Sequence, residues 1–256
     1  MLESVQKKDK ALGRKLNDQR RFIIVEGLYR NSGTIAPLDE IIALKHEFHY
    51  RLMLDESHSF GTLGKTGRGT LELFNKRLMF DAEIVTISIE NALGSIGGVT
   101  IGNEEVVDHQ RLSGAGYCFS ASSPPFTASA AIKSLEQLDT VPSILESCQK
   151  NRAYFYKGLT DLIQTSLDGK VVLVSDELSP MFFLELAEPS TDPAGTMIAI
   201  ETKCLEQGLA VQSTSRAAHG NEMPPALRLN VSGALTEKDM KDALVILRKV
   251  ISSIVV

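Results

Sequence analysis

Three short apolar segments, separated by a helical pattern and by glycine-rich loops, most limit what this 256-residue chain can fold into. They lie at residues 21–26, 51–54 and 84–89. Each is too short for a buried helix and ends at turn or loop residues, which predicts buried strands. Between the first two, Pro37 and the acidic residues after it open a segment with apolar residues at helical spacing, which predicts a helix. The order strand, helix, strand, loop, strand is typical of an α/β domain built on a parallel sheet.

The pattern of predicted elements changes near residue 168. Long helices are predicted over residues 124–165, after which short strands alternate with helices. The predicted strands lie at residues 171–174, 181–186, 209–212 and 227–231, and the helices at 194–207 and 236–253. The last helix begins with Thr236 and Asp239 in the spacing of a capping box. We therefore predict part of a large parallel-sheet domain over residues 1–167 and a small α+β domain over residues 168–256.

Composition and charge exclude several classes of function. The net charge is −5 and the pI is near 5.6, so no basic surface is expected to bind nucleic acid. No apolar run approaches the roughly 18–20 residues that a membrane-spanning helix needs. The cysteines Cys118, Cys148 and Cys204 lack the spacing of metal ligands or redox motifs, so no metal site is predicted. They are expected to be reduced core thiols in a protein that faces the cytosol.

Two glycine clusters follow predicted strand ends, which is where open parallel sheets place ligands. The first cluster begins with Asp55 and has His58 three residues later. An aspartate at a buried strand end is costly unless a cation pairs with it, and a protonated pyridine nitrogen or a nearby arginine would serve. His58 would point into the same pocket. The alternative is an aspartate that caps a loop and a histidine bonded to backbone groups, and spacing alone leaves both open.

The string DESHSFGTLGKTGRG, residues 55–69, resembles a segment of the α-oxoamine synthases, a family of fold-type I pyridoxal-phosphate-dependent transferases. Upstream EGLYRNSGTIAPL, downstream GYCFSASSPP and the segment from Pro225 to Leu229 are similar to the family in the same order. The resemblance implies the C-terminal part of that fold's large domain, followed by its small α+β domain. It also implies that Asp55 pairs with the ring nitrogen of the cofactor and that His58 contacts its phenolic oxygen.

The second glycine cluster departs from the family at one position. Catalytic members carry a lysine ahead of the glycine pair, and this lysine forms the Schiff base with pyridoxal 5'-phosphate. Aligned on Gly94 and Gly97-Gly98, that position is Asn91, and no lysine occurs between Lys76 and Lys133. An amide cannot form an imine, so no catalytic residue is expected in this chain. The strings ENALGSIGG and VVDHQRLSGAGYCFSAS are similar to a lysine-less long-chain-base subunit in this family.

The resemblance to a lysine-less subunit implies a heterodimer in which a lysine-bearing catalytic subunit holds the cofactor covalently. The implied reaction is the decarboxylative condensation of L-serine with palmitoyl-CoA to 3-ketodihydrosphingosine, the first step of sphingolipid biosynthesis. The implied place is the cytosolic face of the endoplasmic reticulum membrane. Two alternatives stay open: a scaffolding or regulatory fragment without activity, and a diverged synthase that acts on another amino acid. Asn91 argues against the second alternative.

Several family features are expected upstream of Met1: a membrane helix, a glycine-rich phosphate-binding turn and the residue that stacks on the cofactor ring. The sequence is therefore expected to be truncated at its N-terminus. Any membrane association would come through that missing segment or through the partner.

Three further positions match binding residues of the family. Arg228 matches the arginine that binds the substrate carboxylate, for which a guanidinium fork is well suited, and its alternative is an ordinary ion pair. Ser120 and Ser122 match a segment that crosses the dimer towards the partner's cofactor phosphate. Short hydroxyls and exposed backbone amides are suitable phosphate donors. The alternative for these serines is an ordinary Ser-Pro turn.

Overall fold

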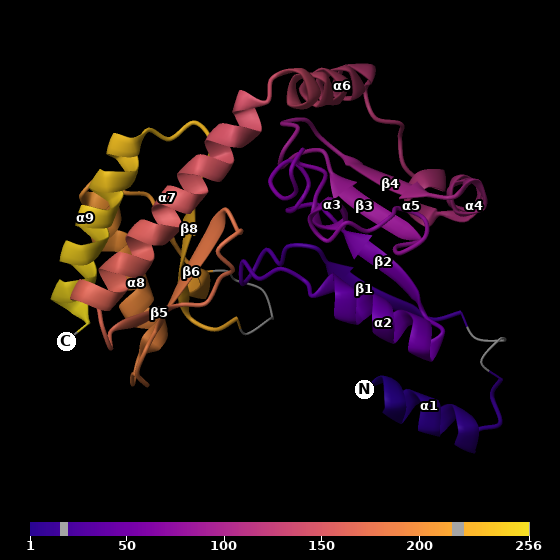
Figure 1. Ribbon diagram of the computed structural model, residues 1–256, viewed down its shortest axis with the longest axis horizontal. Coiled ribbons are helices and arrows are strands. Elements are labelled where there is room, and N and C mark those ends of the chain that lie inside the picture. Colours follow the sequence, from indigo (N-terminus) through magenta and orange to yellow (C-terminus); the bar gives the residue numbers. More distant parts are fainter. Residues whose placement is uncertain (16–19, 217–222, 256) are drawn as a thin grey trace. The chain divides into compact units, whose positions relative to one another are not determined.

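The computed structural model describes residues 1–15, 20–216 and 223–255, and its strands form two separate four-stranded sheets (Figure 1). The chain divides into two compact units. The first consists of Met1–Leu28 and Ile35–Val141, and the second of Tyr29–Thr34 and Pro142–Val256. The strands near residues 171 and 227 lie in a different sheet from the strand at residue 22, which confirms the prediction that they belong to separate sheets.

The sheet of the first unit has the order β1-β2-β3-β4. Its strands are β1 (Phe22–Glu26), β2 (Arg51–Asp55), β3 (Ile84–Ser88) and β4 (Gly98–Gly102). The first three are parallel, as the sequence predicted, and Glu26, Asp55 and Thr86 are aligned at their carboxyl ends. The fourth strand was not predicted. It pairs antiparallel with β3 because the second glycine cluster turns the chain back along it.

The first unit also contains helices. They are α1 (Leu2–Ala11), α2 (Leu38–Phe48), α3 (Thr70–Leu73), α4 (Glu104–Ser113), α5 (Ala115–Cys118) and α6 (Pro125–Thr140). Of these, α2 packs on β2 and α4 contacts β4. Leu52 and Leu54 of β2 are fully buried, and α2 packs on this strand with Ile42 and Phe48 buried. The helix begins after Pro37 as predicted and ends at Phe48, where His49 caps it with a left-handed φ of 56°. The burial of alternate residues along β2 fixes which side chains face this core.

The second unit is an antiparallel sheet packed with three helices. Its sheet has the order β5-β6-β8-β7. The elements are α7 (Ser143–Ser166), β5 (Val171–Leu173), β6 (Met181–Leu186), α8 (Pro193–Glu206), β7 (Gln212–Ser213), the 3-10 helix η2 (Thr214–Arg216), β8 (Ala226–Asn230) and α9 (Glu237–Ile254). One apolar core joins the sheet to all three helices, with Phe182 at 0% exposure against Phe155 of α7.

One prediction about this unit needs correction, and another is left untested. Only Gln212 of the predicted strand at 209–212 is in a strand, because the amide of Leu209 instead donates to the carbonyl of Cys204 and closes α8. The first compact unit ends at Val141 and the second contains Pro142–Val256, so α7 is part of the second compact unit. The boundary after residue 167 stays a prediction about where the family's domains divide.

The three cysteines differ in environment, which corrects the prediction that all are core thiols. Cys204 is fully buried, whereas Cys118 is exposed and Cys148 is intermediate. Burial raises the pKa of the Cys204 thiol to about 11. Only this cysteine is part of the apolar core.

The capping box of α9 gives a direct test of the local structure. The Thr236 hydroxyl accepts from the amide of Asp239 at 3.2 Å, and the Asp239 carboxylate accepts from the amide of Thr236 at 2.9 Å. We expect Thr236→Ala to lower the free energy of unfolding by about 1 kcal/mol, because a helix-terminal amide loses its acceptor. Thr165→Ala, which removes an exposed hydroxyl inside α7, should change it by less than about 0.5 kcal/mol. Urea denaturation of both variants measures the difference, and equal losses would contradict the assignment.

Candidate functional site

Ser57 joins the two glycine clusters at the carboxyl ends of β2 and β3. Its amide donates to Asp55 Oδ1 at 2.7 Å, and its hydroxyl accepts from the amide of Ser88 at 2.9 Å. Its carbonyl accepts from the Asn91 side-chain amide at 2.7 Å. Asn91 Nδ2 also lies 3.4 Å from His58 Nδ1. The structure therefore brings together Asp55, His58 and Asn91, the three residues that the sequence singled out in this unit's strand-end loops.

Asp55 caps its own loop, which is the alternative left open by the sequence. The bond to the Ser57 amide occupies one carboxylate oxygen at the end of β2. This bond orients the carboxylate at the sheet edge, and an oriented carboxylate suits a cationic ring nitrogen. Loop capping and cofactor pairing are therefore compatible roles for this residue.

A buried carboxylate next to the site holds the first loop in place. Glu56 is 1% exposed and accepts from the amides of Thr70 at 2.9 Å and Leu71 at 3.0 Å. It also accepts from the hydroxyls of Thr70, at 2.6 Å, and Ser59. These bonds tie the start of the loop to the first turn of α3. Sequence analysis passed over Glu56 and Ser57, because nothing in their residue types separates them from ordinary loop residues.

Glycines allow the close approaches around these loops. A Cβ on Gly27 would lie 1.9 Å from Thr70 Oγ1, and one on Gly69 would lie 2.5 Å from Glu56 Oε2. Gly61 has a φ of 78°, and a Cβ there would lie 2.3 Å from that of Ala92. The two glycine clusters are thus in direct contact, and side chains larger than hydrogen are excluded at these points.

Arg228 lies on β8 in the second unit and is half-buried. Its Nη2 donates to Met181 Sδ at 3.2 Å, its Nε donates to Asn230 Oδ1 at 3.3 Å, and its guanidinium lies 6.0 Å from the Phe183 ring centroid. Burial, followed by the like charge of Arg30, lowers the pKa of Arg228. Among residues 1–15, 20–216 and 223–255 no carboxylate pairs with this guanidinium. The ion-pair alternative for Arg228 is therefore not realised within the described chain, and its environment suits an anion.

The predicted phosphate-binding serines lie on an exposed segment between α5 and α6. Ser120 and Ser122 are both exposed, and Phe119 beside them is 90% exposed. The Ser120 hydroxyl donates to the carbonyl of Gly116 and so closes α5, while Pro124 and Pro125 begin α6. Both serines are therefore accessible to solvent. A side chain that contacts a partner subunit must be accessible in this way.

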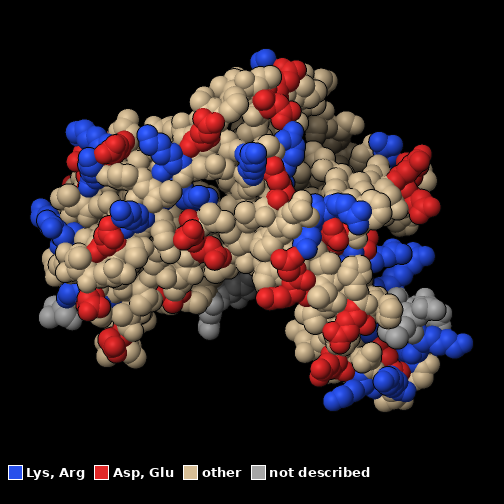
Figure 2. Space-filling model, in the orientation of Figure 1, with Lys and Arg blue, Asp and Glu red and all other residues tan. Residues whose placement is uncertain are grey.

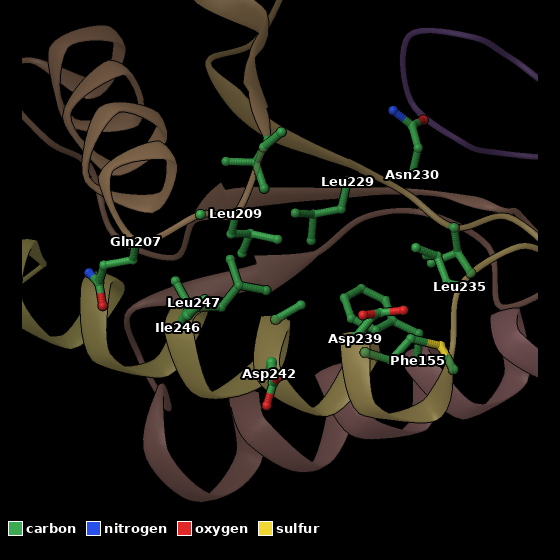
Figure 3. Close-up of a pocket in the computed structure, with 16 residues that line it drawn as sticks. Phe155, Gln207, Leu209, Leu229, Asn230, Leu235, Asp239, Asp242, Ile246 and Leu247 are labelled. Carbon is green, nitrogen blue, oxygen red and sulfur yellow. The ribbon is translucent and has the colours of Figure 1, made fainter.

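A pocket of about 500 Å³ in the second unit lies between β8 and α9 (Figure 3). Leu229 and Asn230 of β8 line it, whereas Arg228 is not among its lining residues. Its acidic lining residues already have partners, since Asp239 belongs to the capping box and Asp242 pairs with Lys238 at 2.6 Å. Among its described lining residues, this pocket therefore offers no unpaired charge for chemistry.

Charged side chains of both signs are mixed over the visible face of the molecule (Figure 2). Neither sign dominates a region there, in keeping with the net charge of −5. The helices of the described residues include none that is both long and apolar enough to cross a membrane.

Comparisons with known proteins agree on the family and the fold. The family model "Aminotransferase class I and II" matches residues 4–247. Long chain base biosynthesis protein 1c of Oryza sativa subsp. japonica is 39% identical over 241 residues, which are 92% of this chain and 48% of that protein. Serine palmitoyltransferase 1 of Dictyostelium discoideum is 36% identical over 255 residues, 97% of this chain and 53% of that protein. The chain thus spans about half the length of these curated relatives.

A solved structure gives the same fold. Serine palmitoyltransferase from S. paucimobilis with bound PLP and myriocin superimposes with a TM-score of 0.81 at 23% identity, covering 99% of this chain and 60% of that one. At this identity the likeness concerns the fold alone. It confirms the predicted α/β fold of the fold-type I pyridoxal-phosphate-dependent transferases.

The Glu56 network gives a stability prediction for the site. We expect Glu56→Ala to lower the free energy of unfolding by about 3 kcal/mol or more, because four buried donors lose their acceptor. Glu90→Ala in the other loop removes an exposed carboxylate and should cost less than about 0.5 kcal/mol. Chemical denaturation measures both changes. A loss at Glu56 no larger than that at Glu90 would show that the network does not hold the loop.

Proposed function

The chain belongs to the aminotransferase class I and II family, and on this premise we propose that it is the lysine-less subunit of a serine palmitoyltransferase. The names of its relatives in Oryza sativa and Dictyostelium discoideum support this choice of enzyme. In this proposal, a lysine-bearing partner carries out the condensation of L-serine with palmitoyl-CoA that begins sphingolipid synthesis. The heteromer would work at the cytosolic face of the endoplasmic reticulum membrane.

Asn91 is the observation that carries the proposal. Its side-chain amide donates to the Ser57 carbonyl and lies 3.4 Å from His58 Nδ1. Aligned on the glycine pair, this position corresponds to the lysine of catalytic members. Asp55 and His58 suit the ring nitrogen and phenolic oxygen of pyridoxal phosphate, which when bound supplies an electron sink. Asn91 has no amine to form an imine. The residues of this chain therefore fit the cofactor's ring but not its covalent attachment, which we assign to the partner.

The exposed Ser120–Ser122 segment supports a role at the boundary with the partner. Its hydroxyls and amides are accessible on the first unit, and they are suitable donors to the phosphate of a cofactor held by another chain. Such a contribution requires no lysine in this chain. Arg228 is the candidate for the serine carboxylate, since its guanidinium has no carboxylate partner among the residues described.

The first test concerns covalent attachment. In a heteromer reconstituted with the lysine-bearing subunit and treated with pyridoxal phosphate and borohydride, we expect the fixed cofactor on the partner. None should appear on the peptide that spans residues 77–132 of this chain, because that stretch contains no lysine, nor on Lys76 or Lys133 at its ends. Asn91→Lys, which restores an amine beside His58, is the matched positive control. Peptide mass spectrometry locates the label, and stoichiometric labelling of Lys76 or Lys133 would refute the assignment.

The second test separates the two groups of residues. Replacing Ser120 and Ser122 by leucine should weaken cofactor or acyl-CoA binding by the heteromer about tenfold or more, since a charge-assisted hydrogen bond contributes roughly 1.5–3 kcal/mol. Asp55→Asn should lower stability more than activity, because Asp55 faces a site without a lysine. Condensation rates and melting temperatures of the two complexes give the comparison. If Asp55→Asn abolishes turnover in a folded complex while the serine changes leave it intact, the roles are reversed.

A further inference from the structure

Four side chains of the second unit's sheet meet around the guanidinium of Arg228. The strands β6 and β8 pair antiparallel, with Phe183 opposite Arg228 and Met181 opposite Asn230. Residues directly opposite one another in such a pair, and residues two apart along a strand, share one face of the sheet. Phe183 and Met181 are buried, at 1% and 5% exposure. The register of the two strands thus places three possible contacts for the guanidinium beside it.

The two hydrogen bonds of Arg228 occupy one edge of its guanidinium. Nε donates to Asn230 Oδ1 at 3.3 Å, and Nη2 donates to Met181 Sδ at 3.2 Å. These two nitrogens form the side edge of the planar group. The ring of Phe183 lies 6.0 Å from the central carbon of the guanidinium. The protein itself therefore orients the side edge of Arg228.

The end edge of the guanidinium, formed by Nη1 and Nη2, is left for a ligand. Within residues 1–15, 20–216 and 223–255, no acceptor bonds to Nη1. A planar fork of two N–H donors matches the two oxygens of a carboxylate. A carboxylate can therefore bind end-on to Arg228 without displacing either internal acceptor.

Both internal acceptors of Arg228 are neutral. A thioether sulfur is a weak acceptor, and the side-chain oxygen of an asparagine carries no formal charge. Burial lowers the pKa of Arg228, and the like charge of Arg30 lowers it further, so the charged form is held at a cost. An aspartate in place of Asn230 would offset that cost with a charge-assisted hydrogen bond. Asn230 orients the guanidinium and yet leaves its charge for a ligand.

We propose that Asn230 is a positioning residue, which presents the end edge of Arg228 to a substrate carboxylate and keeps the positive charge of Arg228 uncompensated. This role rests on the proposed function, in which Arg228 binds the carboxylate of L-serine. It adds that the carboxylate binds end-on, through Nη1 and Nη2. It also adds that an acidic side chain in place of Asn230 is incompatible with substrate binding.

The first measurement is a titration of the purified full chain with L-serine and with acetate, followed through the arginine side-chain signals in nitrogen NMR spectra. Arg228→Lys identifies the Arg228 signals by their loss. We expect saturable shifts that are larger at Nη than at Nε, because the carboxylate meets the end edge. Ethanolamine, which lacks the carboxylate, should cause no such shift. Larger shifts at Nε, or no saturable shift with either carboxylate, overturn the proposal.

Asn230→Asp tests the charge. We expect it to weaken carboxylate binding about tenfold or more, because the new internal carboxylate competes for the guanidinium. The melting temperature should stay the same or rise, because Arg228 gains a counter-charge. Asn103→Asp is the matched control, since it changes the net charge equally and aspartate also caps a helix. This control should leave carboxylate binding unchanged.

Asn230→Ala separates orientation from charge. It removes the acceptor of Arg228 Nε without adding a charge, so carboxylate binding should weaken measurably but less than in Asn230→Asp. Equal losses in the two variants, both with a lowered melting temperature, would show that Asn230 only supports the local structure. Unchanged binding in either variant would likewise contradict the positioning role.

The reconstituted heteromer distinguishes a failure of this role from a failure of the proposed function. If the heteromer condenses serine while Arg228 binds no carboxylate, the role of Asn230 is wrong and the proposed function stands. If acetate binds at Arg228 and the Asn230 variants weaken it as expected, the role of Asn230 is supported. It is supported even where the heteromer shows no condensation, and in that case the proposed function fails.

Discussion

The buried carboxylate of Glu56 is the interaction on which the candidate site depends. It collects four donors from the loop after β2 and from the first turn of α3, and no basic side chain of the described residues is recorded beside these bonds. A buried carboxylate is tolerated only when its oxygens are bonded in this way. The loop above it is thereby fixed, and Asp55, Ser57 and His58 are held at the sheet edge. Gly27 and Gly69 are small because the network leaves no room beside it.

Asn91 changes the chemistry of the site while keeping its architecture. Its side-chain amide bonds to the Ser57 carbonyl and so links the loop after β3 to the loop after β2. Ser57 in turn bonds to the amide of Ser88 and to Asp55, so one residue connects both strand ends. A neutral amide can make such a bond without placing a charge at the sheet edge. An asparagine at this position is thus compatible with an ordered site.

Local patterns predicted much of the fold. The three parallel strands, the helix after Pro37 and the capping box at Thr236 follow from apolar spacing and from residues with strong local preferences. The predicted strand at 209–212 was almost entirely wrong, because the end of α8 takes the amide of Leu209. A helix terminus competes for backbone groups in a way that strand propensity does not reveal. Cys118 was placed in the core by residue type, yet as the last residue of α5, a short helix without buried residues, it lies at the surface.

The sequence by itself determined the α/β class, the presence of Asp55 and His58 at a strand end, and the absence of an imine-forming lysine at Asn91. These are properties of residue identity and of local spacing, which folding does not alter. Only the tertiary structure decided that Ser57 and Glu56 organise the site, that β4 returns antiparallel beside β3, and that Arg228 has no carboxylate partner among the described residues. Each of these depends on groups far apart in the chain meeting at one point. Hydrogen bonds and close approaches of that kind arise from packing, and no local pattern records them.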